Sequence, residues 1–259
     1  MIPIILLIPF YLIISTYYNY YFISIWNLLL PKQVLIWDLP LRLFHWLFAL
    51  TVLASWYTSD QDNDLIDIHM KLGYFALGLL VFRILWGFVG TKHSRFSSFF
   101  PTPNRLKLYI NDLRSNQVKH NTGHNPLGSL MVFLMIFLIS LQAISGLFIN
   151  DDVFSSGPYY DSVSKEVEKI MFFLHHNIFD FMIAAIAMHL LAIAYYERVK
   201  KQSLIRPMIT GKKSEKLVKV NDIIQHSKIL LSVLLVIAVA AFIYWLVVVN
   251  APIIEEYYY

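Results

Sequence analysis

The sequence contains no cysteine. This absence excludes disulfides, thiolate-held zinc, iron–sulfur clusters and covalent haem attachment through C-x-x-C-H. Charge is also scarce, since Asp, Glu, Lys and Arg make up 15% of the chain while 58% of it is hydrophobic. A soluble core built from 259 residues could not cover so many uninterrupted apolar runs. The composition therefore predicts a membrane protein.

The first 30 residues lack charge altogether, and so they lack the basic start that a secretory signal carries before its apolar region. Pro3 and Pro9 interrupt this stretch, and a tyrosine cluster follows them. We expect residues 1–31 to form an apolar N-terminal extension that lies in the membrane or at its interface, with an extra spanning helix as the alternative.

Five further apolar runs are long enough for a helix to approach or cross the hydrocarbon core of a bilayer, which takes about 20 residues. They occupy approximately residues 40–57, 68–89, 127–149, 170–196 and 229–249. Backbone polar groups inside a bilayer must be satisfied within helices or closed barrels. We therefore predict an all-α membrane protein, with a four-helix transmembrane bundle in residues 32–213 and a fifth C-terminal transmembrane helix in residues 214–259.

The connectors between these runs alternate in charge. Lys and Arg dominate residues 90–125 and 198–228, whereas Asp and Glu dominate residues 59–67 and 151–168. The positive-inside rule then places the basic connectors in the cytoplasm and the acidic connectors and the C-terminus outside. We expect a multi-pass membrane protein whose C-terminus faces outward. Membrane orientation explains the basic residues, and no nucleic-acid motif is present.

Histidines inside the spans carry the first functional signal. His175 and His189 are fourteen residues apart. In a helix this spacing places both side chains on nearly the same face, within roughly 40° of each other, and separates them by about 21 Å along the axis. His176 lies about 100° off that line. Two imidazoles on one face, separated by most of the apolar thickness, suit two haems held one above the other in a helical bundle.

The topology also assigns a depth to each histidine. His45 lies near the cytoplasmic start of the first span, and His69 lies near the outer start of the second. Matched depths predict that His45 pairs with His189 and that His69 pairs with His175. Each pair could hold a non-covalent haem b by bis-histidine ligation. A lone intramembrane histidine is more often a helix–helix hydrogen bond or a pore-lining group, but four at two matched depths favour haem.

Haem propionates are anionic and need cations near them. Arg42 lies three residues before His45, and Lys71 lies two residues after His69. Arg83 lies fourteen residues after His69, on nearly the same helix face, at the depth of the inner haem. We expect these three cations to contribute to cofactor binding. The alternative for each is a cation that snorkels at a helix end.

Other polar groups near the spans carry weaker signals. His124 could serve a propionate or a quinone head group, but a loop histidine is more often solvated. We expect His93, His120 and His226 to face solvent as well. Asp180 on the fourth span is either a proton-handling carboxyl or the partner of a neighbouring polar group.

Several motifs carry a resemblance to a known family. They are VLIWDLPLRLFHWLFAL, DIHMKLGYFALGLLVFRILWGFVGTKHSRF, GHNPLGSLMV and LIRPMITGKK, spread over residues 33–213. In this order they resemble the bacterial cytochrome b561 family, which includes the cytochrome b subunits of nickel–iron hydrogenases and is related to the membrane subunits of formate dehydrogenase. The resemblance implies a four-helix di-haem core whose ligands fall on His45, His69, His175 and His189.

The resemblance also implies a function. We expect a membrane di-haem cytochrome that carries electrons between an outer donor or acceptor, either a c-type cytochrome or a redox enzyme subunit, and the quinone pool. It would act within a larger oxidoreductase complex of a respiratory chain. One alternative is a stand-alone quinone-linked oxidoreductase acting on a small substrate such as superoxide at an open outer haem edge, ringed by Lys71, Lys165 or Lys169. The other is a haem-free scaffold or transporter.

Overall fold

The computed structural model describes residues 32–59, 65–115, 117, 121–150 and 155–252. The predicted N-terminal extension and the last seven residues lie outside this part of the chain. Within the described ranges the structure is almost entirely helical, apart from two short strands and the connecting loops. The predicted all-α class is therefore confirmed.

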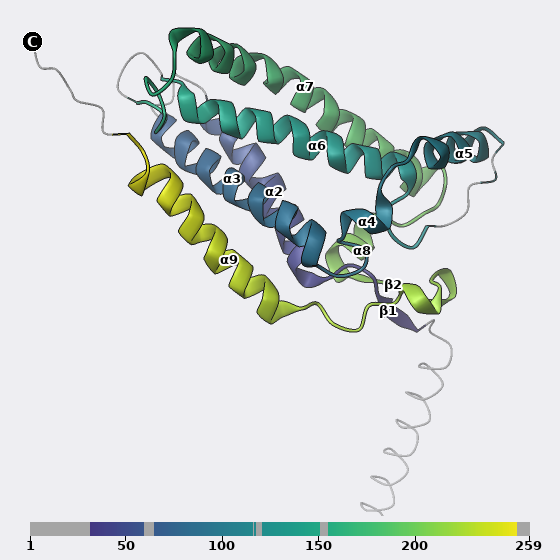
Figure 1. Cartoon of the computed structure of the whole chain (residues 1–259). Helices are drawn as coiled ribbons and strands as arrows, with labels where there is room; N and C mark the ends of the chain where they lie inside the picture. The colour runs from purple at the N-terminus through teal and green to yellow at the C-terminus, as the bar shows by residue number, and fades with distance from the viewer. Residues whose placement is uncertain (1–31, 60–64, 116, 118–120, 151–154, 253–259) are drawn as a thin grey trace, which may run out of the picture.

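Five helices have the length and apolarity needed to cross a membrane (Figure 1). They are α2 (Leu39–Thr58), α3 (Ile66–Val89), α6 (Pro126–Ser145) with the 3-10 turn η3 (Gly146–Phe148), α7 (Lys165–Arg198), and α9 (Ile229–Tyr244) with a π-helical turn η6 (Trp245–Val249). The predicted four-helix bundle with a fifth C-terminal helix is thus confirmed. At 34 residues, α7 would span about 51 Å, and it therefore extends past the hydrocarbon layer at its ends.

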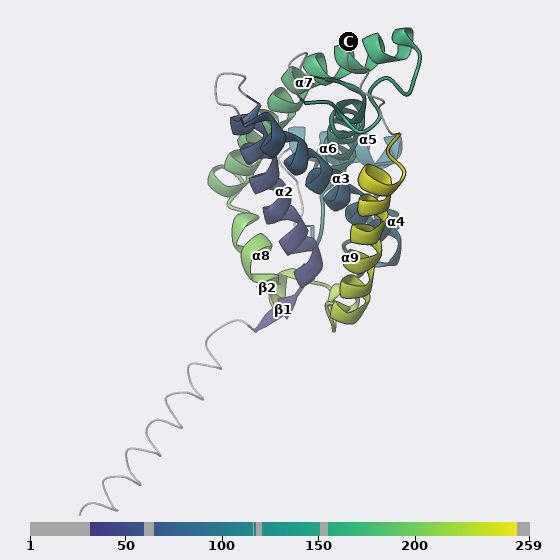
Figure 2. The same cartoon turned by 90° about the vertical axis from the view of Figure 1, so that its left-hand side faces the viewer.

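The helices pack as two pairs. α2 lies along α3, α6 lies along α7, and α3 also contacts α6. α9 lies on the far side of α3, which Figures 1 and 2 both show. A Cβ at Gly78 of α3 would meet Ile243 of α9 at 3.5 Å, an ordinary van der Waals distance, so α9 packs directly against this face of α3. Large apolar side chains such as Leu191 and Leu230 stay more than 70% exposed, as expected of helices that face lipid.

One end of the bundle, here called the basic end, gathers the described residues of the ranges 32–38, 90–125 and 198–228. It contains three short helices, α4 (Phe96–Phe99), α5 (Pro103–Arg114) and α8 (Ile205–Thr210), and two 3-10 turns, η4 (Glu215–Leu217) and η5 (Val220–Asp222). Strand β1 (Gln33–Leu35) pairs antiparallel with β2 (Lys212–Ser214). The strand pair joins the start of α2 to the segment after α7, and it was not predicted.

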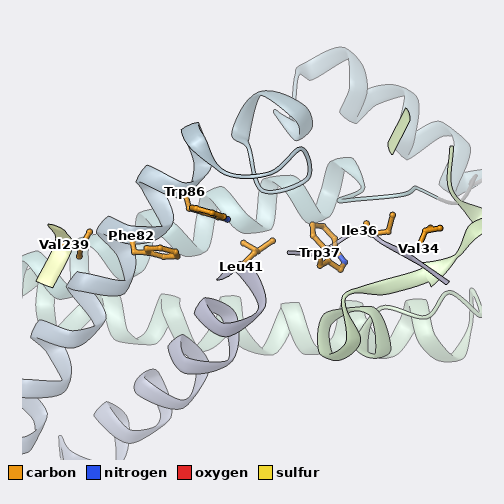
Figure 3. Close-up of a cluster of buried hydrophobic side chains, with 7 residues drawn as sticks. All are labelled: Val34, Ile36, Trp37, Leu41, Phe82, Trp86 and Val239. Atoms are coloured by element: carbon orange, nitrogen blue, oxygen red, sulfur yellow. The ribbon is translucent and has the colours of Figure 1, made fainter. Parts of the chain in front are cut away.

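A buried apolar cluster joins the basic end to the bundle. Figure 3 shows its seven side chains, which are Val34, Ile36, Trp37, Leu41, Phe82, Trp86 and Val239. They come from β1, α2, α3, α9 and the residues that join β1 to α2. Since Val239 belongs to α9, the fifth helix shares a core with the rest of the bundle and is not a loosely attached addition.

A fully buried carboxylate lies beside this cluster. Asp38 caps α2, because its Oδ1 accepts hydrogen bonds from Leu41 N at 2.8 Å and from Trp86 Nε1 at 3.1 Å. Its Oδ2 accepts from the hydroxyls of Thr91 and Ser94. Four donors thus replace the water that a buried carboxylate loses, and they tie α2, α3 and the following loop together.

The opposite end, here called the acidic end, contains the connectors from α2 to α3 and from α6 to α7. Ser155 Oγ donates to Asp67 of α3 at 3.0 Å. Tyr159 donates to the backbone oxygen of Leu246 at 2.8 Å and accepts from Asn250 at 3.1 Å. The α6–α7 connector therefore holds both α3 and the end of α9. The connectors alternate between the two ends as the charge pattern predicted.

Candidate haem sites in the bundle

The structure brings the four span histidines together in two pairs. His45 of α2 faces His189 of α7 near the basic end, with ring centroids 6.5 Å apart and an interplanar angle of 55°. His69 of α3 faces His175 of α7 near the acidic end, with centroids 6.2 Å apart and an angle of 87°. We call these the basic-end pair and the acidic-end pair. They are the partners that matched depth predicted.

The ring spacing tests whether a metalloporphyrin fits. An iron bound about 2.0 Å from one nitrogen of each ring would place the two centroids roughly 6.2 Å apart, because each centroid lies about 1.1 Å beyond its nitrogen. Both observed spacings agree with this value. A direct hydrogen bond between two imidazoles would bring the centroids to roughly 5 Å. The spacing therefore fits rings that share an iron better than rings that bond to each other.

Hydrogen bonds fix the rings of the acidic-end pair. His69 Nδ1 donates to the backbone oxygen of Ser55 at 2.8 Å, and His175 Nδ1 donates to the backbone oxygen of Gln142 at 3.0 Å. Because a carbonyl oxygen only accepts, both rings carry their proton on Nδ1, which leaves Nε2 as the lone-pair donor. This arrangement is typical of metal-ligating histidines, whose second nitrogen is held by a carbonyl or carboxylate.

A cavity of about 380 Å³ surrounds the acidic-end pair. Its lining is mostly apolar and includes Val52, Trp56, Ile139 and Phe179. A Cβ at Gly73 would meet no protein atom within 4 Å, so this glycine borders open space. An apolar cavity with two facing imidazoles has the chemistry that a haem requires, since the porphyrin is apolar and the iron needs two nitrogen ligands.

A second glycine acts directly on a ligand ring. A Cβ at Gly146, where α6 passes into η3, would lie 2.9 Å from His175 Cε1. Only a residue without a side chain leaves the imidazole its present place. The sequence analysis missed Ser55, Gln142 and Gly146 because two of them act through backbone oxygens and the third through the absence of a side chain.

The surroundings of the basic-end pair are different. His45 Nδ1 is shielded from solvent and has no hydrogen-bond partner among the described residues. The same holds for Arg42 Nε, three residues earlier on α2, and for His124 Nδ1 just before α6. Arg42 Nη1 donates to the backbone oxygen of Ile209 in α8. Three nitrogens without a partner thus lie at this end of the bundle.

Arg83 does not snorkel. Its side chain is buried at 2% exposure, its Nη1 donates to Ser94 O at 3.2 Å, and its guanidinium lies 4.7 Å from the ring centre of Phe96. The snorkelling alternative for Arg83 therefore does not hold, because the loop after α3 folds back over this side chain. Lys71, the third predicted cation, is exposed near the acidic end.

Two loop histidines expected in solvent are shielded instead. His93 is 7% exposed and donates through Nε2 to Asp222 O at 2.7 Å. His124 lies between Trp37 and Phe99, with ring centroids 4.8 Å and 4.4 Å away. Burial lowers the pKa of His93, and it lowers the pKa of His124 to about 3. Both predictions were wrong because β2, η5 and α4 fold over this loop.

The remaining candidates stay outside the pairs. His176 is exposed and donates through Nδ1 to Phe172 O of its own helix at 2.9 Å. Asp180 is exposed on α7, and His226 is exposed as predicted. His120 lies outside the described residues.

The fold and the facing imidazoles together define a multi-pass membrane bundle with two pairs of histidine rings in its interior. A family model described as prokaryotic cytochrome b561 matches residues 36–211. The chain belongs to this family. It is therefore a membrane b-type cytochrome, and the family implies haem b as its cofactor.

Curated relatives point the same way. The chain is 25% identical over 217 residues to a Rhodobacter capsulatus protein named "Probable Ni/Fe-hydrogenase B-type cytochrome subunit", covering 71% of this chain and 82% of the relative. Proteins with the same name from Azotobacter chroococcum mcd 1 and Rhizobium leguminosarum bv. viciae are 26% and 23% identical, covering 69% and 70% of this chain and 87% and 89% of the relatives. No solved structure matches the chain closely enough for comparison.

Proposed function

We propose that this cytochrome is an electron-transfer subunit that carries electrons across the bacterial inner membrane through two non-covalent haem b groups. The basic-end pair, His45 and His189, would hold one haem, and the acidic-end pair, His69 and His175, the other. Bound haem supplies one-electron exchange at iron. The observation that carries the proposal is the spacing of both ring pairs, 6.5 Å and 6.2 Å, which suits an iron between each pair.

The chain's own residues set the conditions for that chemistry. The carbonyls of Ser55 and Gln142 hold the acidic-end rings in one tautomer, and this makes Nε2 the more basic ligand. The apolar lining keeps water out and lowers the local dielectric, which tunes the potential of a buried metal centre. The two ligands on α7 lie about 21 Å apart along the axis, so the crossing is divided into shorter steps.

The two ends of the bundle would serve different redox partners. Relatives bear the name of hydrogenase cytochrome subunits, and so we propose that a redox enzyme subunit docks at the acidic end, outside the cytoplasm, with a c-type cytochrome as the alternative. A membrane quinone would exchange electrons with the haem pair. The collection of basic connectors at the opposite end supports a cytoplasmic basic end and a periplasmic C-terminus.

A stand-alone superoxide enzyme has less support. Such an enzyme needs free cations around an open outer haem edge to attract the anion. Lys165, one of the three lysines suggested for this ring, instead pairs with Asp161 at 2.7 Å and with Glu168 at 3.0 Å. The local acids offset its charge, and we therefore favour a protein partner at this end.

Haem stoichiometry tests the proposal. We expect the full-length chain, purified from membranes in mild detergent, to contain two haem b per chain by the pyridine haemochrome assay. We also expect a reduced-minus-oxidised spectrum with two b-type components. One haem per chain would refute the two-centre proposal, and a chain without haem would leave the scaffold alternative.

A further inference from the structure

The shielded nitrogens at the basic end indicate a missing acceptor. Arg42 Nε and His124 Nδ1 are both inaccessible to solvent, and neither has a hydrogen-bond partner among the described residues. Buried polar atoms in native proteins are nearly always paired with protein, water or ligand. A hydrogen-bond acceptor that the described residues do not supply therefore belongs near each of these nitrogens.

The charge around His124 specifies the sign of that acceptor. Positive charge on Arg83 and Lys213 acts on His124. Lys213 Nζ donates to the backbone oxygens of Asn121 and Thr122, at 3.1 Å and 2.8 Å, and these neutral carbonyls do not balance its charge. A half-buried cation such as Lys213, whose hydrogen-bond acceptors are neutral, favours an anionic ligand nearby.

The nearby carboxylates are already engaged. Asp38 accepts four hydrogen bonds from the groups that it ties together. Asp222 pairs with Lys92 at 2.8 Å and accepts from Thr122 at 3.1 Å. Neither carboxylate is left over to neutralise Arg42 or His124, so within the described part of the chain an external anion is needed for this role.

We propose that Arg42 and His124 bind the propionate carboxylates of the haem at the basic-end pair, and that Arg83 does not. This inference rests on the proposed function. Arg42 lies about one turn from His45 on the cytoplasmic side of α2, where a propionate edge would emerge. Arg83 is occupied by Ser94 and Phe96.

Local packing holds Arg42 in position for this role. Its Nη1 is fixed by Ile209 O, so the guanidinium cannot swing into solvent. Gly211, with φ of +81°, lies against it, and a Cβ there would be 3.1 Å from Arg42 Nε. A side chain at position 211 would therefore crowd the atom that lacks a partner. The glycine keeps space around Nε for a carboxylate oxygen.

The test compares two probes, protohaem and protohaem dimethyl ester, whose propionates are blocked. They are titrated into the full-length apoprotein carrying His69→Ala, which leaves only the basic-end pair complete. We expect protohaem to bind more tightly than the ester. Arg42→Gln and His124→Gln should each reduce that preference by about ten-fold, the size of one charge-assisted hydrogen bond. The matched control is Lys216→Gln, an exposed cation at the same end, which should keep the full preference.

Each outcome decides a separate question. An unchanged preference in both variants would overturn the inference and leave the two haems in place. If quinol oxidation fell while the preference stayed the same, His124 would belong to a quinone site, which also overturns it. Failure of the unsubstituted chain to bind either probe would refute the proposed function itself.

A second measurement covers variants that bind neither probe. In the chain with all four ligands, Arg42→Gln should lower the midpoint potential of the basic-end haem, because loss of a nearby cation favours ferric iron. Arg42→Lys, which keeps the charge, should restore most of it. A potential that is equal in wild type and Arg42→Gln would overturn the inference.

Discussion

Asp38 shows how much one side chain contributes at the basic end. Its carboxylate is fully buried and accepts from the backbone of Leu41, the indole of Trp86 and the hydroxyls of Thr91 and Ser94. These groups belong to three separate segments of the chain. The sequence did not single out Asp38, since the partners of a capping carboxylate beyond its own helix are fixed by tertiary folding.

We predict that Asp38→Asn destabilises the protein by about 2–4 kcal/mol. The amide keeps one acceptor oxygen, but its NH₂ group replaces the oxygen that accepts from the hydroxyls of Thr91 and Ser94. Thermal unfolding in detergent, followed by circular dichroism, measures the change. Asp112→Asn on the exposed face of α5 is the control and should change stability little. Equal effects of the two substitutions would argue against the role given to Asp38.

His93 gives the protein a pH dependence of known sign. Burial holds its pKa below the usual value of about 6.5. As the pH falls through about 6.5, His93 takes up a proton in the unfolded chain but stays neutral in the folded chain. The free energy of unfolding therefore decreases. The pKa of Asp222 is lowered mainly by its bond to Lys92, so the loss of that contribution comes only at more acidic pH.

We expect the midpoint temperature of thermal unfolding to decrease when the pH is lowered from 7.5 to 5.5. This decrease should be smaller in His93→Gln than in wild type. His226→Gln, which alters an exposed histidine, should leave the pH dependence unchanged. A wild-type slope retained in full by His93→Gln would show that other groups cause the dependence.

At the scale of elements, the contact between the end of α6 and α7 sets the acidic-end pair. Gly146 lies where α6 passes into η3, and the ring of His175 occupies the space next to it. Ser145 Oγ lies 3.3 Å from His175 Nδ1, so this end of α6 both supports and limits the ring. The position of one ligand therefore depends on the packing of two helices.

We predict that Gly146→Ala displaces His175 and lowers occupancy of the acidic-end haem, while the basic-end haem stays in place. Haem content and the potentials of the two components measure this. Gly78→Ala is the matched control, because its added Cβ meets Ile243 at an ordinary 3.5 Å, away from both histidine pairs. Full two-haem occupancy in Gly146→Ala would contradict the prediction.

At the scale of the whole molecule, long-range hydropathy and charge determined what could be predicted. Five apolar runs gave the five spanning helices, and alternating connector charge gave the two ends. Helical period and topological depth together predicted which histidines face each other, because both are properties of whole spans. These signals persist over 20 residues or more, and local irregularity does not hide them.

Features at the basic end could not be predicted, because each of them depends on only a few residues. Strands β1 and β2 have three residues each, too few to show an alternating pattern. His93 and His124 lie in a polar loop whose composition resembles solvated chain, and only the folding of β2 and α4 over them removes water. Arg83 was placed correctly on its helix, but its partner Ser94 comes from a loop whose path the sequence does not specify.

The central claim is that four imidazoles hold two haems in the stated pairs. The most direct measurement is the redox-resolved absorbance spectrum of four single variants, with His176→Ala as the control that keeps both centres. The account predicts that His45→Ala and His189→Ala lose one and the same b-type component, and that His69→Ala and His175→Ala lose the other. Loss of a single shared component in His45→Ala and His69→Ala would contradict it.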